Sequence, residues 1–466
     1  MPPAAAIGNF PQEKRTTVPH ITAGLRRRAR RVRFALAAIA VAGSLGCAPS
    51  FALDVPALKA QIGAVLDQSY PELDALYKDL HRHPELSFQE VETARRLATE
   101  MRRLGFEVTE GVGRTGIVAI LRNGPGPMVL VRTELDALPM EEKTGLPYAS
   151  RSKAVWNGKE TFVAHSCGHD IHMAAWVGTA KALVATKAQW HGTLMFVGQP
   201  AEEGGHGARR MLEDGLFTRF GKPDAGFALH VGPGPYGEIG YRPGVFSSSA
   251  DSLQIGFHGK GAHGSMPSAS IDPVVMASRF VLDVQTVVSR EKDAGAFGVV
   301  TIGAIQGGTA ANIIPDNVVV RGTVRSYEED VRRKLHAGIV RTAKAVADMA
   351  GAPEPDIRIT DDYNAVINDD ALTARTAEVF QAAFGDKVKR RPTPTPASED
   401  YSDFVMAGVP SLYFGLGALD PRDIAAARKA GKPVPVNHSP FFAPVPEPTI
   451  RTAVEAMSLA VLNVLQ

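Results

Sequence analysis

The sequence predicts an α/β protein in which a mostly parallel sheet carries helices on both faces, with a ferredoxin-like α+β domain inserted into it. Two observations predict this fold class. Short apolar runs bounded by Gly and Pro alternate with segments of helical periodicity, as expected for strands that are buried on both faces. In the middle of the chain the order changes to β-α-β-β-α-β, and the earlier alternation resumes near Asn364.

The part before the insertion begins with two helical segments and continues with buried strands. Gly105 ends the second helical segment, and Gly and Pro residues bound the strands that follow. The expected helices are 58–83, 91–104 and 170–187, and the expected strands are 115–121, 128–132, 193–198 and 225–231. Strands that alternate with helices in this way favour a parallel sheet.

The insertion and the last part of the chain complete the division into domains. In the insertion the expected strands are 252–258, 298–304, 318–326 and 357–360, and the expected helices are 273–290 and 328–350. Helices 372–384 and 449–465 then flank strand 411–415, whereas 392–396 and 419–435 are expected to be loops. We therefore divide the chain into a signal peptide and N-terminal extension (1–52), a first part (53–246), an inserted domain (247–362) and a second part (363–466).

Composition and charge are those of an ordinary globular protein. The chain has 466 residues, of which 44% are hydrophobic and 21% are charged. Its net charge of +2 conceals an asymmetry, because residues 1–52 hold eight basic residues and one acidic residue. The remainder therefore carries 43 basic against 48 acidic residues. A mildly acidic body argues against nucleic acid as a partner.

The N-terminal region has the order of a secretory signal: a basic run at 26–33, an apolar run at 34–45 and then small residues. We expect export to the periplasm or beyond, with cleavage near Ala52. A lipoprotein is the less favoured alternative, because Ser44 stands where such a signal has Leu. The apolar run is too short to span a bilayer. If the leader is removed, Cys167 is the one remaining cysteine, so it is either buried and inert or committed to chemistry.

Residues suited to divalent metal chemistry gather at strand and helix ends. They are Cys167 and His169 before a helix, the pair Glu202 and Glu203 after a strand, His230 at the end of the next strand, and His438 near the C-terminus. Thiolate, imidazole and carboxylate ligands together suit Zn, Mn, Co or Ni better than Ca or Mg. Adjacent glutamates repel unless one binds a cation, which leaves the other free as a general base.

Each of these signals is weak when taken alone. A single histidine at a strand end is more often structural, and a Glu-Glu pair is more often a solvated face. We interpret His81 and His83 as structural residues at a helix end, and we expect His172 and His206 to lie near the site.

The motifs in combination resemble those of the two-metal aminoacylase/carboxypeptidase peptidase family. The resemblance is strongest to its amidohydrolase branch of hippurate hydrolases, N-acyl-amino-acid deacylases and auxin-conjugate hydrolases, and it extends over residues 58–465. The motifs occur in the family's order: Leu80-His81-Arg82-His83-Pro84-Glu85-Leu86-Ser87, Asp136-Ala137-Leu138-Pro139, Cys167-Gly168-His169-Asp170, Gln199-Pro200-Ala201-Glu202-Glu203, Gly259-x-Gly261-x-His263, Asn312-Ile313-Ile314-Pro315 and Asn437-His438-Ser439.

The resemblance implies a role for each of these site residues. Two divalent metal ions per subunit would be held by Cys167, His169, Glu203, His230 and His438. Glu202 would be the general base that activates a metal-bound water, and Asp170 would orient a ligand. The inserted domain would be a lid or dimerisation domain, in which His263 stabilises the oxyanion, often across a homodimer interface. Asn312 and Arg325 would hold the substrate carboxylate, although Arg325 as a plain salt-bridge residue stays open.

The chain also departs from the resembled pattern. Ser268 stands where relatives commonly have His, Glu134 where most have Asp, and Gly232 where a Trp is common. The segment 420–434 has the character of an extra loop beside His438.

The expected activity is cleavage of the amide bond of N-acyl amino acids or short dipeptide-like substrates. The alternatives are a metallo-carboxypeptidase or dipeptidase of the same family, a thiol hydrolase that uses Cys167, and a non-catalytic metal- or ligand-binding protein on this fold.

Overall fold

The computed structural model describes residues 53–466. The expected signal peptide, its cleavage site and the lipoprotein alternative lie outside the described residues. Within residues 53–466, no helix combines the length and the apolar character required to cross a membrane.

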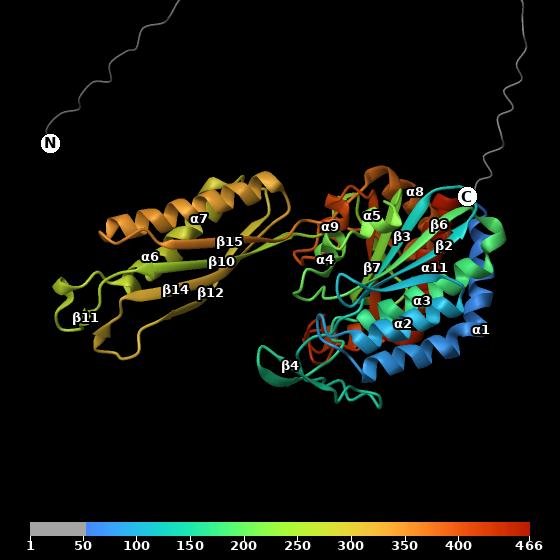
Figure 1. Cartoon of the computed structure of the whole chain (residues 1–466), viewed down its shortest axis with the longest axis horizontal. Helices are drawn as coiled ribbons and strands as arrows, with labels where there is room; N and C mark the ends of the chain where they lie inside the picture. The colour runs from blue at the N-terminus through green and yellow to red at the C-terminus, as the bar shows by residue number, and fades with distance from the viewer. Residues whose placement is uncertain (1–52) are drawn as a thin grey trace, which may run out of the picture. The chain divides into compact units, whose positions relative to one another are not determined.

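A sheet of eight strands forms the centre of the main domain (Figure 1), which comprises the described residues outside 249–363. Its strand order is β1-β2-β6-β3-β7-β18-β8-β17, and β6, β3, β7 and β18 form a parallel core with antiparallel neighbours outside it. The strands are β1 Glu107–Val112, β2 Gly116–Asn123, β3 Met128–Glu134, β6 Gly192–Gln199, β7 Ala225–Pro235, β8 Ile239–Tyr241, β17 Val388–Arg390 and β18 Ser411–Leu419. The mostly parallel sheet expected from the buried apolar runs is therefore confirmed.

Helices cover both faces of this sheet because its central strands are apolar on both sides. In β6, Leu194 and Phe196 belong to one buried cluster, whereas Met195 and Val197 belong to another on the opposite face. Helices α1 Val55–Arg82, α2 Val91–Arg103, α3 His169–Ala185, α8 Asp370–Phe384 and α11 Pro446–Leu465 contribute to the first cluster. Helices α4 Gly207–Glu213, α5 Leu216–Phe220 and α9 Ser402–Met406 contribute to the second.

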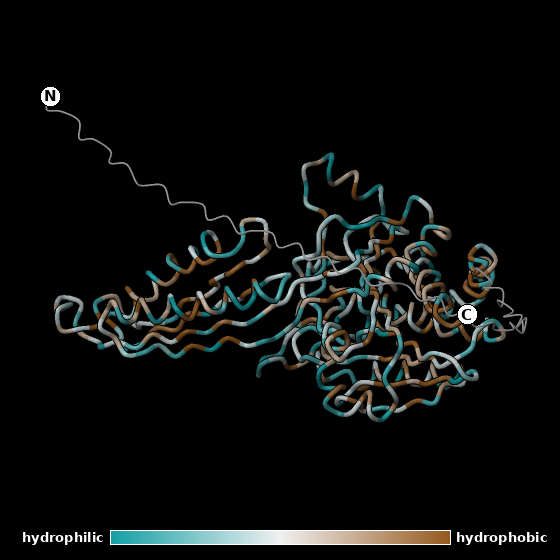
Figure 2. Tube along the Cα trace, turned by 90° about the horizontal axis from the view of Figure 1, so that it is seen from above, coloured by the Kyte–Doolittle hydropathy of each residue, from teal (hydrophilic) through white to brown (hydrophobic). Residues whose placement is uncertain are grey.

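The small domain, which we define as residues 249–363, has its own sheet and its own core. Its elements are β10 Ser249–His258, α6 Pro273–Thr286, β12 Gly298–Gly307, β14 Asn317–Ser326, α7 Glu329–Met349 and β15 Asp356–Tyr363. The antiparallel strand order β12-β14-β10-β15 is that of a ferredoxin-like fold, as expected. Along α6 and α7 the trace alternates between hydrophobic and hydrophilic residues (Figure 2), and the hydrophobic residues pack on the sheet. The boundaries at 246/247 and 362/363 stay a prediction.

Short elements complete the fold, and one of them corrects an expectation. The additional strands are β4 Lys153–Trp156, β5 Lys159–Phe162, β9 Gly244–Val245, β11 Ala262–His263, β13 Ile313–Ile314 and β16 Ile367–Asn368. The segment 419–435 was expected to be a loop, but it contains helix α10, Pro421–Lys429. This expectation was wrong because Asp420 caps the helix through its side chain, which accepts a hydrogen bond from Arg422 N at 2.8 Å, and Pro421 begins it.

Candidate metal centre

A tight turn before α3 brings Cys167 and His169 together. Gly168 between them has φ +92°, and a Cβ atom at this position would lie 2.4 Å from Cγ2 of Val231. Only glycine adopts this conformation in this space without strain. The two ligand candidates, which would not share one face of a regular helix, can therefore both turn toward the carboxyl ends of the parallel strands.

Five predicted ligands form two groups of three that share Cys167. One group is Cys167, His169 and His230, and the other is Cys167, Glu203 and His438, with all candidate ligand atoms in each group within 4.8 Å of one another. Cys167 Sγ lies 3.3 Å from His230 Nε2, and His438 Nε2 lies 3.3 Å from Glu203 Oε2. One shared thiol with two separate pairs of partners is an arrangement suited to two adjacent cations.

The histidine rings are oriented as metal ligands usually are. His169 Nδ1 lies 2.8 Å from the main-chain oxygen of Asp136, and His230 Nδ1 lies 2.7 Å from that of Val231. A carbonyl oxygen accepts, so each Nδ1 carries the proton and each Nε2 presents a lone pair toward Cys167 and Glu203. The main chain therefore fixes the tautomer that a divalent cation requires.

Two buried polar atoms without hydrogen-bond partners show that the predicted ligands fit a cation. His169 Nε2 and Glu203 Oε1 are both buried without a hydrogen-bond partner, and they face each other at 3.9 Å. Unpaired buried polar atoms are costly, so two of them at one point require an explanation. A bound divalent ion would satisfy both, and the donor set of sulfur, imidazole and carboxylate matches the borderline metals expected from the sequence.

The Cys167 thiol has a raised pKa in this environment. Burial is the largest cause, and the negative charges of Glu203 and Glu202 add to it. The protein alone therefore does not provide a thiolate nucleophile, which disfavours the thiol-hydrolase alternative. A bound cation would favour the deprotonated sulfur.

Glu202 is placed beside the ligands without being bonded to any of them. It is buried, and its carboxylate lies in a group with His169 and Glu203. The pKa of Glu202 is raised, mainly by burial and then by the negative charges of Glu399 and Glu203. A carboxyl group with a raised pKa next to a cation site has the properties of a general base that later acts as an acid.

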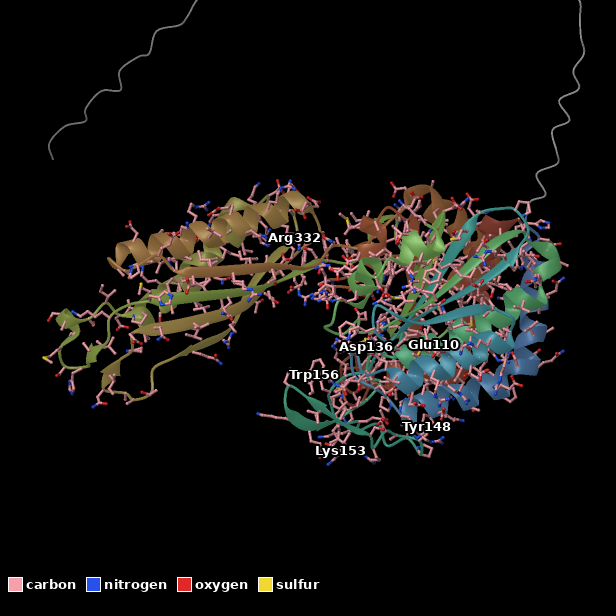
Figure 3. The ribbon with its side chains drawn as sticks, in the orientation of Figure 1. Glu110, Asp136, Tyr148, Lys153, Trp156 and Arg332 are labelled. Carbon is pink, nitrogen blue, oxygen red and sulfur yellow. The ribbon has the colours of Figure 1, made fainter. Side chains whose placement is uncertain are left out.

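Two residues that we did not predict as site residues hold the ligands in place. Asp136 follows β3 (Figure 3), and its Oδ2 accepts hydrogen bonds from Ser87 Oγ at 2.7 Å and from Glu203 N at 2.9 Å. Asn437 Nδ2 donates to the main-chain oxygens of Cys167 and Val231, each at 3.0 Å. Asp136 and Asn437 both belong to motifs seen in the sequence, but nothing in the motifs indicates what they bond.

A buried cluster of charges behind the ligands was also missed. Arg132, which is fully buried, donates to Gln199 Oε1 at 2.8 Å, Glu399 Oε1 at 2.7 Å and Asp400 Oδ1 at 3.1 Å. It also donates to Glu134, whose other oxygen lies 2.8 Å from Nδ1 of His172. One guanidinium thus holds three carboxylates. The signal available in the sequence was an arginine at the end of an apolar run, followed by Thr133 and Glu134.

His81 and His83 agree with their structural interpretation, whereas Asp170 does not agree with its expected role. His81 is buried, with Nδ1 2.6 Å from Asp170 Oδ2 and Nε2 3.1 Å from Glu142 Oε1. His83 is exposed at the end of α1. We expected Asp170 to orient a metal ligand, but its carboxylate bonds His81 and the main-chain N–H of Ile171 instead. His172 does lie beside the ligands, because its Nε2 accepts from Val231 N at 2.9 Å.

The three predicted residues of the small domain are not all brought together, because Arg325 lies apart from the other two. His263 and Asn312 lie side by side, since β11 pairs with β13 and Gly264 N donates to Asn312 O at 2.8 Å. Arg325 lies at the other end of β14, where it donates to Pro396 O at 3.1 Å and Ser398 Oγ at 2.7 Å. Ten paired positions of β10 and β14 separate these ends, which corresponds to about 30 Å.

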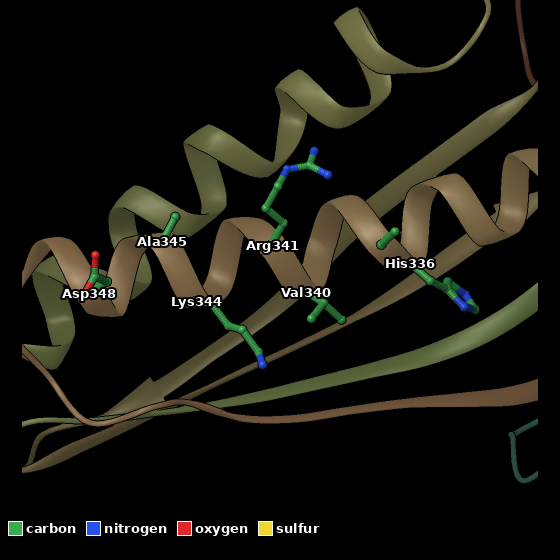
Figure 4. Close-up of a pocket in the computed structure, with 7 residues that line it drawn as sticks. His336, Val340, Arg341, Lys344, Ala345 and Asp348 are labelled. Carbon is green, nitrogen blue, oxygen red and sulfur yellow. The ribbon is translucent and has the colours of Figure 1, made fainter.

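A hollow in the small domain contains none of the predicted site residues. Its volume is about 760 Å³, and it follows α7 past His336, Arg341 and Asp348 (Figure 4). It lacks the cysteine, histidine and carboxylate grouping found in the main domain, so we place the candidate site at the metal centre.

Comparisons with known proteins agree with this choice. Residues 130–431 match the model of peptidase family M20/M25/M40. The N-acetyl-L-cysteine deacetylase of Bacillus subtilis (strain 168) is 32% identical over 76% of this chain and 82% of its own. The hippurate hydrolase of Campylobacter jejuni is 35% identical over 72% of this chain and 85% of its own. The YXEP protein of Bacillus subtilis, a dinuclear metal-binding peptidase of solved structure, matches with a TM-score of 0.69 and 28% identity, over 87% of this chain and 99% of its own.

Proposed function

The chain belongs to peptidase family M20/M25/M40, and we propose that it is a metal-dependent amidohydrolase that cleaves the amide bond of N-acyl amino acids. The observation that carries this proposal is the pair of three-residue groups that share Cys167, with Glu202 beside them. Related proteins that bear names of deacetylases and hydrolases of this substrate class support it.

The proposed cofactor is a pair of divalent cations of the Zn, Mn, Co or Ni type. One would be held by Cys167, His169 and His230, and the other by Cys167, Glu203 and His438. When bound, such cations polarise the amide carbonyl and favour deprotonation of water.

The proposed proton transfers use Glu202. Its carboxylate takes a proton from water as the water oxygen forms a bond to the carbonyl carbon. The same carboxyl group then returns the proton to the amide nitrogen as the C–N bond breaks, which releases a carboxylic acid and an amino acid. The raised pKa of Glu202 supports this double role, because the group must hold the proton between the two steps.

The oxyanion and the substrate carboxylate are assigned to the small domain. His263 would donate a hydrogen bond to the oxyanion, and Asn312 and Arg325 would bind the carboxylate. His263 and Asn312 lie at the end of the small domain remote from Arg325, so we propose that they serve the site of a second subunit in a homodimer. Arg325 would then serve its own subunit.

Export is a separate proposal that rests on the basic and apolar runs of residues 1–52. N-terminal sequencing of the protein from fractionated native cells tests it. We expect a mature chain that begins near Leu53 and is found outside the cytoplasm, and an intact Met1 would contradict this expectation.

The decisive experiment is a hydrolysis assay with a panel of N-acyl amino acids and dipeptides. Each substrate is tested with the purified protein, after chelation, and after addition of Mn, Zn, Co or Ni. We expect cleavage of N-acyl amino acids that chelation abolishes and metal restores. Preference for dipeptides would favour the carboxypeptidase or dipeptidase alternative, and bound metal without any turnover would favour a binding protein.

A further inference from the structure

The loop that carries Glu202 is unusually constrained. Ala201 and His206, on either side of the base, have positive φ values of 50° and 55°, which residues other than glycine rarely adopt. Gly205 and Gly207 are packed tightly: a Cβ atom on Gly205 would lie 2.5 Å from Cβ of Ala201, and one on Gly207 would lie 1.6 Å from Pro200 O. Backbone of this kind persists only where the surrounding structure holds it in place.

Three hydrogen bonds from side chains outside the loop hold the main chain of residues 201–203. Ala201 N donates to Glu90 Oε1 at 2.7 Å, and Glu203 N donates to Asp136 Oδ2 at 2.9 Å. The main-chain oxygen of Glu202 accepts from the hydroxyl of Tyr363 at 3.2 Å. Among residues 53–466, Tyr363 provides the one hydrogen bond found to this oxygen. Glu90 and Asp136 belong to the main domain, whereas Tyr363 ends β15 of the small domain.

Neighbouring contacts strengthen this connection between β15 and the loop. The ring of Tyr363 packs on the ring of His206, with centroids 4.8 Å apart. Arg209, in the first turn of α4, donates to the main-chain oxygen of Asp362 at 3.1 Å. The end of β15 therefore contacts Glu202, His206 and the first turn of α4. Figure 1 shows the direction in which β15 runs toward the main domain.

From these contacts we propose that Tyr363 is a positioning residue, which holds the Glu202 main chain so that its carboxylate meets the reacting water. The inference rests on the proposed function, because it assigns Glu202 the role of base. It also links the small domain to catalysis through its last strand, independently of any residue at the remote end of that domain. Burial raises the pKa of the Tyr363 hydroxyl, which therefore stays protonated and able to donate.

The chain offers a matched control. Tyr327, just after β14, also donates its hydroxyl from the small domain to a main-chain oxygen of the main domain, that of Pro394 at 3.0 Å. Its acceptor lies in the segment 392–396, which does not carry the base. Tyr363→Phe and Tyr327→Phe thus each remove one hydroxyl and one bond between the domains, but only the first removes a bond to Glu202.

The test measures kcat, KM, bound metal and thermal unfolding for wild type and both variants, on the N-acyl amino acid that wild type cleaves best. We expect Tyr363→Phe to lower kcat about tenfold with KM within about twofold, the loss expected from one hydrogen bond that acts in the transition state. Tyr327→Phe should stay within about twofold of wild type. Metal content should be unchanged in both.

A second variant separates positioning from a general structural role. In the background Glu202→Gln, a residue that acts through Glu202 has nothing left to position, so adding Tyr363→Phe should change the residual rate less than twofold. A tenfold loss in that background would overturn the inference, and so would equal losses in the two tyrosine variants or a Tyr363→Phe enzyme with wild-type kcat. If wild type itself shows no metal-dependent hydrolysis, the proposed function fails first, and this inference falls with it.

Discussion

The metal centre and the remote end of the small domain both hold residues predicted from sequence motifs, yet they differ in how many other residues surround and hold them. At the metal centre, Cys167 and His169 are buried, and their partners Glu203, His230 and His438 come from three other segments of the chain. At the remote end of the small domain, His263 and Asn312 are exposed, and within residues 53–466 the imidazole of His263 bonds only its neighbour Ser265, with Nδ1 2.7 Å from Oγ.

The difference shows that the main-domain sheet alone places the residues of the metal centre, whereas it does not place His263 and Asn312. The carboxyl ends of parallel strands converge at one edge of the sheet, so residues there meet as soon as the main domain folds. His263 lies on β11, which pairs with β13 beyond the ten paired positions of β10 and β14, so the folding of the main domain does not fix its position relative to the metal centre.

The largest expected effect is at the metal centre. Glu202→Gln removes the base but keeps the size of the side chain, and we expect a loss of kcat of about a thousandfold, within the range known for general acid-base catalysis. Bound metal, measured by elemental analysis, should stay close to wild type because Glu202 is not a proposed ligand. Near-normal turnover would show that the buried group does not supply the catalytic base.

A second change tests whether a buried histidine of the main domain must be a metal ligand. His81 is buried like His169, but its two ring nitrogens already bond Asp170 and Glu142. His81→Gln should lower the free energy of unfolding by about 3 kcal/mol, as for a broken buried ion pair, and should leave the bound metal unchanged. Loss of metal with unchanged stability would contradict this assignment.

The same pair predicts a pH dependence. Burial alone lowers the pKa of His81, but the hydrogen bonds to Asp170 and Glu142 outweigh it and raise the pKa to about 10. A raised folded-state pKa gives stability that is complete below the unfolded value of about 6.5 and is lost as the pH rises toward 10. The stability difference between wild type and His81→Gln should therefore shrink between pH 6.5 and 10 in denaturant unfolding.

The next prediction concerns the remote end of the small domain. His263→Ala should lower kcat about a hundredfold, the usual cost of one lost oxyanion donor. If His263 acts on the partner's site, a mixture of His263→Ala and Glu202→Gln subunits forms hybrid dimers with one intact site. Equal mixing should then restore about a quarter of the wild-type activity. Subunit exchange without recovery would place His263 in its own subunit's site.

The fold was largely predictable because its signals are local. Apolar runs in β2, β3, β6 and β7 and the periodicity of α1 and α2 are properties of contiguous residues. The strands that were missed carry little of this signal: β8 and β17 have three residues each, and β1 is mostly exposed. Helix α10 was missed although Asp420-Pro421 is a helix start, and the helix is short, with Gly431 and Pro433 soon after its end.

The site was predictable in its residue types and less so in its contacts. The sequence shows which residues suit a cation, and strand ends indicate that they converge. It does not show that Arg132 bonds Glu399 and Asp400, which lie more than 260 positions away, nor that Tyr363 reaches the Glu202 main chain. These partners are brought together only by the packing of separate segments of the chain. No local sequence pattern predicts such contacts.

The smallest expected effect decides whether Arg325 belongs to the site or to the connection between the domains. In the structure its guanidinium bonds Pro396 O and Ser398 Oγ, directly before Glu399. If Arg325 also binds the substrate carboxylate, Arg325→Gln should reduce kcat/KM about tenfold for a substrate with a free carboxylate and leave the matching carboxamide unaffected. An equal loss on both substrates would instead make Arg325 a support for the segment that carries Glu399, and the substrate carboxylate would then require another partner.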